Sequence, residues 1–269
     1  MDKAKTVVVA GLGEIGRPIF ELASRCRRTL GIDLAPLAET VGPVDILHVC
    51  YPFAIPDFIG ETARYIKRFN PEVTIINSTV SVGTTRAIAQ RTGTAVVNSP
   101  VRGKHARMTE DLLHYTKFVG AIDADNGARA AEHFQSLGMK THVLSSPEAS
   151  ELAKLTETTY FGVIIAWAQE VERYCDQFAQ NYDEVVSFYE EIGYLPRVKF
   201  FPGVIGGHCV MPNIEILKRL VPSELLQVIE SSNRKKMDRE ALKVKDVVEA
   251  GKEKLPVQRA VAGTSAGMA

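Results

Sequence analysis

The stretch KTVVVAGLGEIGRPIF at residues 5–20 decides the fold. Its apolar beginning predicts a buried strand, GLGEIG follows at 11–16, and the residues after the last glycine predict a helix. In such a turn Gly11 permits the tight bend, Gly13 lets the backbone approach a pyrophosphate, and Gly16 lets the helix pack close to the strand. The pattern therefore predicts a strand–turn–helix unit that binds a dinucleotide.

Strand-like and helix-like segments alternate from this unit to about residue 146. Such alternation predicts a mostly parallel sheet with helices on both faces, an α/β Rossmann fold with a doubly wound sheet. Further strands are expected at residues 28–33, 44–52, 74–79, 95–100, 117–122 and 140–145.

The pattern changes near Pro147, where about 30 residues show apolar positions at helical spacing. No strand alternation follows, so the second domain is expected to be all-helical. We therefore expect three parts. They are a dinucleotide-binding Rossmann domain at 1–146, a long connecting helix with a helical dimerisation and substrate domain at 147–254, and a disordered tail at 255–269.

Composition excludes several classes of function. Lys and Arg together number 32, as do Asp and Glu, so the chain lacks the basic field that nucleic-acid binding needs. No apolar run reaches the roughly 18 residues of a membrane span, and the N-terminus lacks the h-region of a signal peptide. The four cysteines form no CxxC pair and no metal-ligand spacing, which predicts free thiols, no metal site and a cytoplasmic location.

One acidic residue indicates which dinucleotide is bound. Asp33 ends the second predicted strand 22 residues after Gly11, where a carboxylate accepts hydrogen bonds from a ribose 2′-OH and repels a 2′-phosphate. NAD is therefore expected, although Arg17, Arg27 and Arg28 leave NADP as an alternative. The predicted cofactor-binding residues are Gly11, Gly13, Glu14, Ile15, Gly16, Asp33, Tyr51, Pro52 and Thr79.

The loop FFPGVIGGHCVMPN at residues 200–213 is the most unusual segment of the second half. Its glycines let the backbone approach a ligand, and a cation near Cys209 would favour the thiolate that acts as a nucleophile. On its own, however, a Gly-Gly-His-Cys loop is more often a turn with an inert thiol.

Five segments carry a resemblance to a known family: GLGEIG at 11–16, NSTVSVGTTR at 77–86, ELAKLTETTY at 151–160, PGVIGGHCVMPN at 202–213 and SSNRKK at 231–236. With them, residues 5–250 resemble the UDP-glucose/GDP-mannose dehydrogenase family, the NAD-dependent nucleotide-sugar dehydrogenases. The separation of 55 positions from Lys154 to Cys209 is similar to the family's spacing.

The resemblance implies a four-electron oxidation of a primary alcohol to an acid. Cys209 would attack the intermediate aldehyde, and a second hydride transfer would give a thioester that water hydrolyses. Lys154 would stabilise developing oxyanion charge, and Thr79 would lie near the nicotinamide and the catalytic water. His208 matches a residue that some branches carry beside the cysteine. Without the resemblance, Lys154 would be interpreted as a solvated helix lysine paired with Glu157.

The sequence departs from the family pattern at three places. Thr158 stands where the family has an asparagine, and Asn213 stands where it has an acid, although asparagine cannot act as a carboxylate base. SPVRGKH at 99–105 replaces a Pro-Glu pair and is similar to the substrate loop of the β-hydroxyacid and 6-phosphogluconate dehydrogenases. Its basic residues suit an anionic substrate, or else form a solvated loop. The expected catalytic residues are Cys209, Lys154, Thr79, His208, Asn213 and Thr158, and the expected substrate-binding residues are Arg102, Lys104, His105, Lys154, Gly206, Gly207 and Arg197.

Apolar residues cover more than one side of the predicted long helix, which therefore has to be buried. The family's long helix packs against its twofold mate, so a homodimer is expected. Family members also place an arginine of the neighbouring subunit in the active site, for which Arg197 is the candidate. The apolar residues concerned are Tyr160, Phe161, Ile164, Ile165, Trp167 and Ala168.

Family members carry a third domain that holds much of the nucleotide-sugar site, and this chain ends at residue 269. A smaller substrate or a completing partner chain is therefore expected, and UDP-glucose and GDP-mannose should be poor substrates. Three functions stay open. They are four-electron oxidation of a sugar-like or small anionic alcohol, a two-electron dehydrogenase with Lys154 as base, and a catalytically inactive dinucleotide-binding sensor or scaffold.

Overall fold

The computed structural model describes residues 6–33, 41–103, 105–189, 192, 202–207 and 209–253. The chain divides into two compact units, Met1–Phe161 with Gly207–Ser223, and Gly162–Gly206 with Glu224–Ala269. The long helix α6 (Pro147–Gln177) begins where the sequence predicts the second domain to begin, and the division of the units falls inside it. The expected tail at 255–269 lies outside the described residues.

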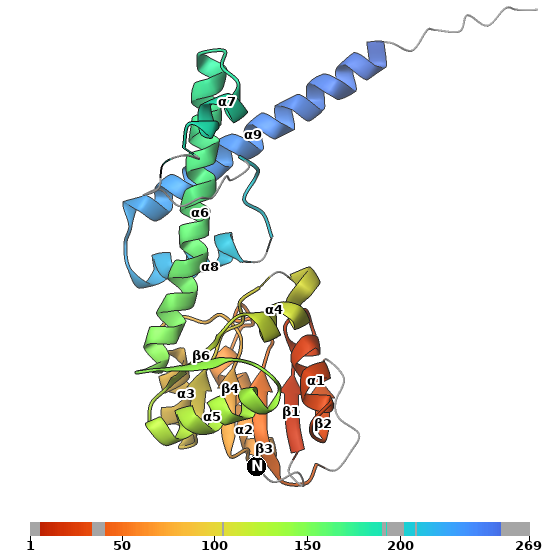
Figure 1. The fold of residues 1–269 in the computed structure, drawn as a ribbon, viewed down its shortest axis with the longest axis vertical. Coiled ribbons are helices and arrows are strands. Elements are labelled where there is room, and N and C mark those ends of the chain that lie inside the picture. Colours follow the sequence, from red (N-terminus) through yellow and green to blue (C-terminus); the bar gives the residue numbers. More distant parts are fainter. Residues whose placement is uncertain are drawn as a thin grey trace, which may run out of the picture. The chain divides into compact units, whose positions relative to one another are not determined.

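The first unit is built on a seven-stranded sheet of order β2-β1-β3-β4-β5-β6-β7, part of which is labelled in Figure 1. All neighbouring strands are parallel except β5 and β6, which pair antiparallel with Asn98 opposite Gly120. This confirms the predicted mostly parallel α/β sheet. The strands are β1 (Thr6–Ala10), β2 (Thr29–Ile32), β3 (Val44–Val49), β4 (Val73–Ile76), β5 (Val96–Asn98), β6 (Lys117–Ala121) and β7 (Thr141–Leu144).

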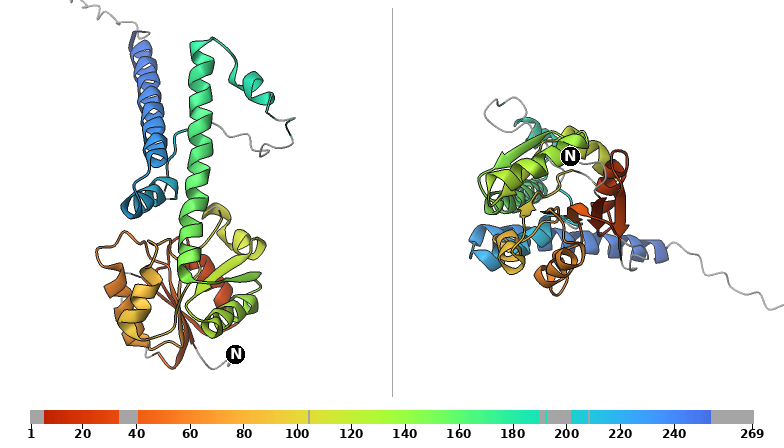
Figure 2. Two further views of the ribbon diagram at one scale, coloured as in Figure 1. Left: turned by 90° about the vertical axis from the view of Figure 1, so that its left-hand side faces the viewer. Right: turned by 90° about the horizontal axis from the view of Figure 1, so that it is seen from below.

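Helices cover both faces of this sheet because successive strand residues point to opposite sides. Val7 and Val9 lie in one apolar core, whereas Val8 and Ala10 lie in the other. In the left view of Figure 2 the sheet lies between α2 and α3, in orange, and α4 and α5, in yellow and green. The helical elements that accompany the sheet are α1 (Gly16–Ser24), α2 (Phe58–Phe69), α3 (Thr84–Thr92), the short 3₁₀ turn η1 (His105–Arg107), α4 (Met108–His114) and α5 (Ala124–Ser136).

The direction of the strands decides which loops meet. The carboxyl ends of β1, β3, β4 and β5 share one edge of the sheet, and the antiparallel β6 brings its amino end to the same edge. This edge therefore receives the glycine turn after β1, the segment after β4 that contains Thr79, and Lys117 at the start of β6. Ligands of open α/β sheets bind at such a carboxyl edge.

In the second unit the described regular elements are helices: α6 from Gly162 onward, α7 (Tyr182–Ser187) and α9 (Glu224–Glu253). A small apolar cluster of Val171, Cys175 and Val186 packs α6 on α7. Buried Lys236 of α9 forms an ion pair with Glu172 of α6 at 2.6 Å. Within the described part of the chain, no helix combines the length and the apolar character of a membrane span.

A histidine pair is buried between the sheet and α5. His48 of β3 and His133 of α5 are fully buried, and their Nε2 atoms lie 2.8 Å apart. The Asn77 side-chain amide donates to the Ile75 carbonyl and also to His48 Nδ1 at 3.0 Å. Burial lowers the pKa of both imidazoles, to about 3 for His133.

Candidate functional site

The glycine turn after β1 has the geometry that a pyrophosphate requires. Gly11 has φ +90°, and a Cβ on Gly16 would lie 1.7 Å from the Gly11 carbonyl oxygen, so neither position tolerates a side chain. A Cβ on Gly13 would meet no atom within 4 Å, which leaves open space in front of the turn. The first turn of α1 contains no acidic residue, and Ile15 provides no side-chain cap. The N–H groups at this helix start are thus oriented to receive an anion.

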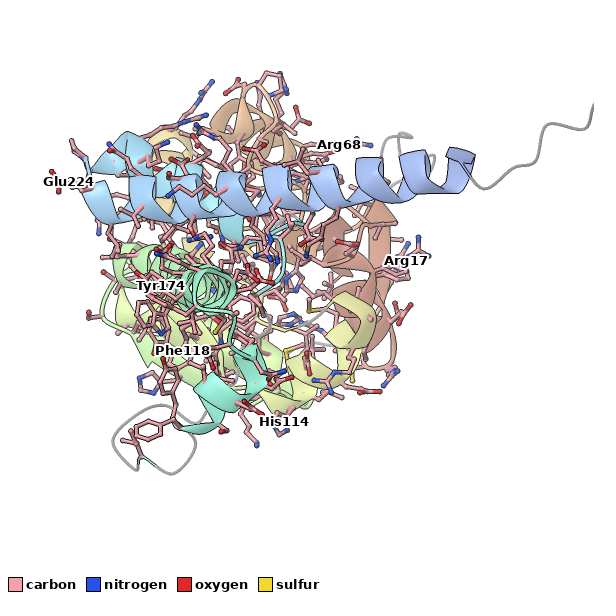
Figure 3. All side chains as sticks on the ribbon, turned by 90° about the horizontal axis from the view of Figure 1, so that it is seen from above. Arg17, Arg68, His114, Phe118, Tyr174 and Glu224 are labelled. Atoms are coloured by element: carbon pink, nitrogen blue, oxygen red, sulfur yellow. The ribbon has the colours of Figure 1, made fainter. Side chains whose placement is uncertain are left out.

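The residues expected to distinguish NAD from NADP lie around β2. Asp33 is exposed and directly follows β2, whose Ile32 is paired with Ala10 of β1 beside the glycine turn. Arg27 forms a buried ion pair with Asp45 at 2.6 Å and is therefore already engaged. Arg17 is exposed and extends outward from the ribbon (Figure 3). The exposed carboxylate of Asp33 fits a ribose diol, so the residues present fit a dinucleotide.

Tyr51, Pro52 and Thr79 follow β3 and β4 at the same edge. The Tyr51 hydroxyl lies 2.6 Å from the Thr62 hydroxyl, and the Tyr51 carbonyl accepts a 2.6 Å hydrogen bond from Ser78. Burial raises the pKa of Tyr51, so its phenol stays neutral. Thr79 is half-buried, next to this anchored serine. These contacts fix the loops that flank the expected nicotinamide position.

A hydrogen bond joins the two helices that carry the expected catalytic residues. Asn213 of α8 (Val210–Leu220) donates its amide to the Thr158 hydroxyl of α6 at 2.8 Å, and both side chains are buried. Lys154 lies one turn before Thr158 on α6, and Cys209 lies one turn before Asn213. The structure thus brings the two family departures into contact with each other, within the first compact unit.

Lys154 is more enclosed than a solvated helix lysine. Its ammonium contacts Glu157 at 3.1 Å, as the i,i+3 spacing predicts, but its side chain is only 11% exposed, whereas that of Glu157 is 54% exposed. An ion pair with an exposed carboxylate is weak and easily exchanged for a ligand. Burial of its stem therefore restricts the position of the Lys154 amine more than that of a solvated helix lysine.

Cys209 occupies the N-cap position of α8 and is exposed. A Cβ added to Gly207, which has φ +76°, or to Gly206 would meet no atom within 4 Å, so both leave room for a ligand to approach the backbone. His208 lies outside the described residues.

The basic loop after β5 is described only in part. The Arg102 guanidinium donates to the Thr116 carbonyl at 2.7 Å and lies over the Phe118 ring, 4.8 Å from its centroid. These contacts with Thr116 and Phe118 thus hold the Arg102 side chain beside the sheet edge. His105 begins η1, but its side chain, Lys104 and Arg197 lie outside the described part of the chain.

A buried lysine that was not predicted from the sequence, Lys117, lies at the same edge of the sheet. Lys117 is 4% exposed, donates to the Ser99 carbonyl at 2.5 Å and lies over the Phe134 ring. Burial lowers its pKa to about 7, and the positive charge of Lys154 contributes to the same shift. The available signal was strand alternation, which places Lys117 on the same face as Val119 and Ala121.

Comparison with known proteins supports the resemblance. Residues 148–235 match the central domain of the UDP-glucose/GDP-mannose dehydrogenase family. A UDP-N-acetyl-D-mannosamine dehydrogenase of Methanocaldococcus jannaschii is 26% identical over 159 residues, which are 57% of this chain and 37% of that protein. The chain spans about a third to two thirds of the length of such curated relatives.

Solved structures show the same fold. A UDP-D-ManNAc dehydrogenase of Pyrococcus horikoshii is similar with a TM-score of 0.77 and 18% identity, over 92% of this chain and 72% of that one. A 3-hydroxyisobutyrate dehydrogenase of Mycobacterium tuberculosis is similar with a TM-score of 0.67 and 15% identity, over 88% and 94%. The chain is thus similar to the UDP-glucose/GDP-mannose dehydrogenases, and its residues 148–235 match the central domain of that family.

Proposed function

We propose that this chain is an NAD-dependent dehydrogenase that oxidises a CH–OH group of a sugar-like or small anionic substrate. The observation that carries the proposal is the Asn213–Thr158 hydrogen bond, which joins the helices of Cys209 and Lys154 within the unit that holds the glycine turn. The similarity to nucleotide-sugar dehydrogenases supports the same reaction class.

The residues of the first unit have separate tasks in this reaction. Bound NAD would supply the acceptor for a hydride. The turn at Gly13 and the start of α1 hold its pyrophosphate, and Asp33 holds a ribose. Lys154 in its neutral form accepts the proton of the substrate hydroxyl, and in its charged form it stabilises a developing alkoxide. Cys209 attacks the carbonyl carbon of the aldehyde once it has formed.

A second candidate, a two-electron dehydrogenase, is favoured by the chemistry around the thiol. Thr158 and Asn213 are buried and bonded to each other, and neither can act as a carboxylate base toward water. Hydrolysis of a thioester on Cys209 would have to proceed without such a base. In this candidate Lys154 is the base, Cys209 only lines the site, and the product is an aldehyde or ketone.

Substitution of the two exposed cysteines separates the candidates. With NAD and UDP-N-acetyl-D-mannosamine or a panel of 3-hydroxy acids as probes, four-electron oxidation gives two NADH per substrate and two-electron oxidation gives one. In the first case Cys209→Ala is expected to abolish acid formation. Cys26→Ala, the other exposed thiol, serves as the control. If NAD raises the melting temperature but is reduced with none of the probes, the enzyme proposal fails and a catalytically inactive dinucleotide-binding sensor or scaffold remains.

We also propose that the functional form is a homodimer formed through α6. Tyr160, Phe161 and Trp167 of this helix are 56%, 46% and 55% exposed in the single chain, although aromatic side chains of this size favour burial. Light scattering of the purified chain should give twice the 29.5 kDa mass of the monomer. A monomeric mass at micromolar concentration would contradict the proposal.

A further inference from the structure

We infer that Glu151 is a positioning residue, whose carboxylate fixes the segment between β4 and α3 against the turn of α6 that carries Lys154. The inference rests on the proposed function, in which Lys154 takes the proton of the substrate hydroxyl, and on the expectation that Thr79 of this segment lies near the nicotinamide. All residues concerned belong to the first compact unit.

The carboxylate of Glu151 accepts three hydrogen bonds at the start of α3. Gly83 N–H donates to Oε2 at 2.7 Å, and the N–H and hydroxyl of Thr85 donate to Oε1 at 2.9 and 2.6 Å. Glu151 is 1% exposed, so these bonds lie away from water. Burial raises the pKa of Glu151, whereas the three donors oppose this change by favouring the carboxylate.

The start of α3 depends on this distant carboxylate. Its N-cap residue is Gly83, which has no side chain to accept a hydrogen bond, and its first turn contains no acidic residue. A helix start normally takes its cap from a serine, threonine, aspartate or asparagine at that position. Here the cap comes from another helix, 66 to 68 residues further along the chain.

The same contact holds the segment with Thr79 at its second end. At its first end, Asn77 N–H donates to the Val49 carbonyl at 2.8 Å, and the Ser78 hydroxyl donates to the Tyr51 carbonyl at 2.6 Å. At its second end Gly83 is bonded to Glu151. Thr79 lies between these two anchors, so its place relative to α6 depends on both of them.

On α6 the carboxylate and the amine are one turn apart. Glu151 and Lys154 have i,i+3 spacing and thus lie on neighbouring positions of one helix face. The segment after β4 is consequently fixed one turn away from the proposed catalytic amine. An error of about 1 Å in such a placement is enough to reduce turnover about 100-fold.

Two other contacts join the first turn of α6 to the sheet unit. The Ser150 hydroxyl lies 2.5 Å from Asn98 Oδ1, and Glu148 forms an ion pair with Arg86 of α3 at 2.6 Å. The Arg86 side chain is 42% exposed, and such exposed pairs contribute little. Glu148 is therefore a matched control, because it is a glutamate of the same helix turn that also contacts α3.

The decisive experiment compares Glu151→Gln with Glu148→Gln. In Glu151→Gln an amide nitrogen replaces one acceptor oxygen and opposes a donor N–H, so at least one bond is lost. Hydrogen exchange at the Gly83 and Thr85 amides is expected to become at least ~10-fold faster, and to stay unchanged in Glu148→Gln. With NAD and UDP-N-acetyl-D-mannosamine, kcat is expected to fall ~10- to 100-fold in Glu151→Gln while the KM for NAD changes less than ~3-fold.

The outcomes separate this inference from the proposed function. Faster exchange in Glu151→Gln with kcat within twofold of wild type would overturn the positioning role and leave a helix cap. Unchanged exchange in Glu151→Gln would show that the Glu151 carboxylate does not hold Gly83 and Thr85, whether or not the wild type is active. If the wild type reduces no NAD but exchange is faster in Glu151→Gln than in the wild type, the hydrogen bonds of Glu151 to the start of α3 are supported while the proposed function fails. If Glu151→Gln does not fold, Thr85→Val, which removes only the hydroxyl donor, carries the same comparison.

Discussion

Lys154→Met is expected to reduce dehydrogenase turnover about 100- to 10,000-fold, because the variant removes the amine that we propose takes the hydroxyl proton. Methionine retains an unbranched apolar stem in an environment where the lysine side chain is only 11% exposed, so the fold should persist. The NADH dissociation constant, measured by fluorescence titration, should change less than ~3-fold, because the glycine turn and Asp33 are untouched.

A second substitution at this position separates two roles of the amine. Lys154→Arg retains a positive charge but cannot deprotonate, so it should be as inactive as Lys154→Met if the residue is a base and partly active if the charge alone is needed. Glu157→Gln, which removes the ion-pair partner and leaves the amine, is the control. Wild-type turnover in Lys154→Met would refute the proposed mechanism and restore the interpretation as a solvated lysine.

The chain is expected to lose stability steeply below about pH 6.5 because of the buried histidine pair. The Asn77 amide donates to His48 Nδ1, so the His48 proton is on Nε2 and is donated to Nε2 of His133. His133 then carries its proton on Nδ1, which has no hydrogen-bond partner in the described part of the chain. A further proton on either ring would face a donor, so geometry as well as burial excludes the charged forms.

Stability falls with falling pH because the unfolded chain binds more protons than the folded chain over this pH range. The pKa of His133 is lowered from 6.5 to about 3 in the folded chain, so between these values the unfolded chain binds more protons. The contribution of His133 to stability is fully present above about pH 6.5 and is lost as the pH falls toward 3, by up to about 1.4 kcal/mol per pH unit. The pKa of His48 is lowered in the same direction.

Urea unfolding at pH 7 and pH 5 measures this loss. His133→Phe should reduce the fall in the free energy of unfolding between these two pH values, while lowering stability at pH 7 by about 1–3 kcal/mol because His48 loses its acceptor. His142→Gln, a change at an exposed histidine of β7, should leave the pH dependence as in wild type. An equal pH dependence of wild type and His133→Phe would show that the pair does not control acid stability.

The sequence predicts the fold well because its evidence is local. GLGEIG after an apolar run predicts the turn, and the expected 30-residue helix corresponds to α6. The reversal of β6 was not predicted, because parallel and antiparallel strands have the same apolar alternation when buried. Strand direction depends on the path of the connection, which residue types do not specify.

The candidate site could be predicted only where a motif is contiguous. The positions of Lys154 and Cys209 come from their motifs, and their roles remain predictions. The bond between Asn213 and Thr158 joins residues 55 positions apart and has no local signature. The Glu151 cap is likewise invisible in the sequence, because Gly83 only shows that a cap is missing and not which residue supplies it.

The direction of one strand decides which end of the segment KFVGA lies at the edge of the sheet that also carries the glycine turn. If β6 ran with its neighbours, Ala121 would reach the ligand edge and Lys117 would lie four residues away, about 13 Å deeper in the sheet. Because β6 is reversed, the amine bonded to Ser99 lies beneath the loop that follows β5. The inverted strand thus supplies this edge with a titratable amine. In an all-parallel sheet of identical sequence the same amine would lie toward the opposite edge.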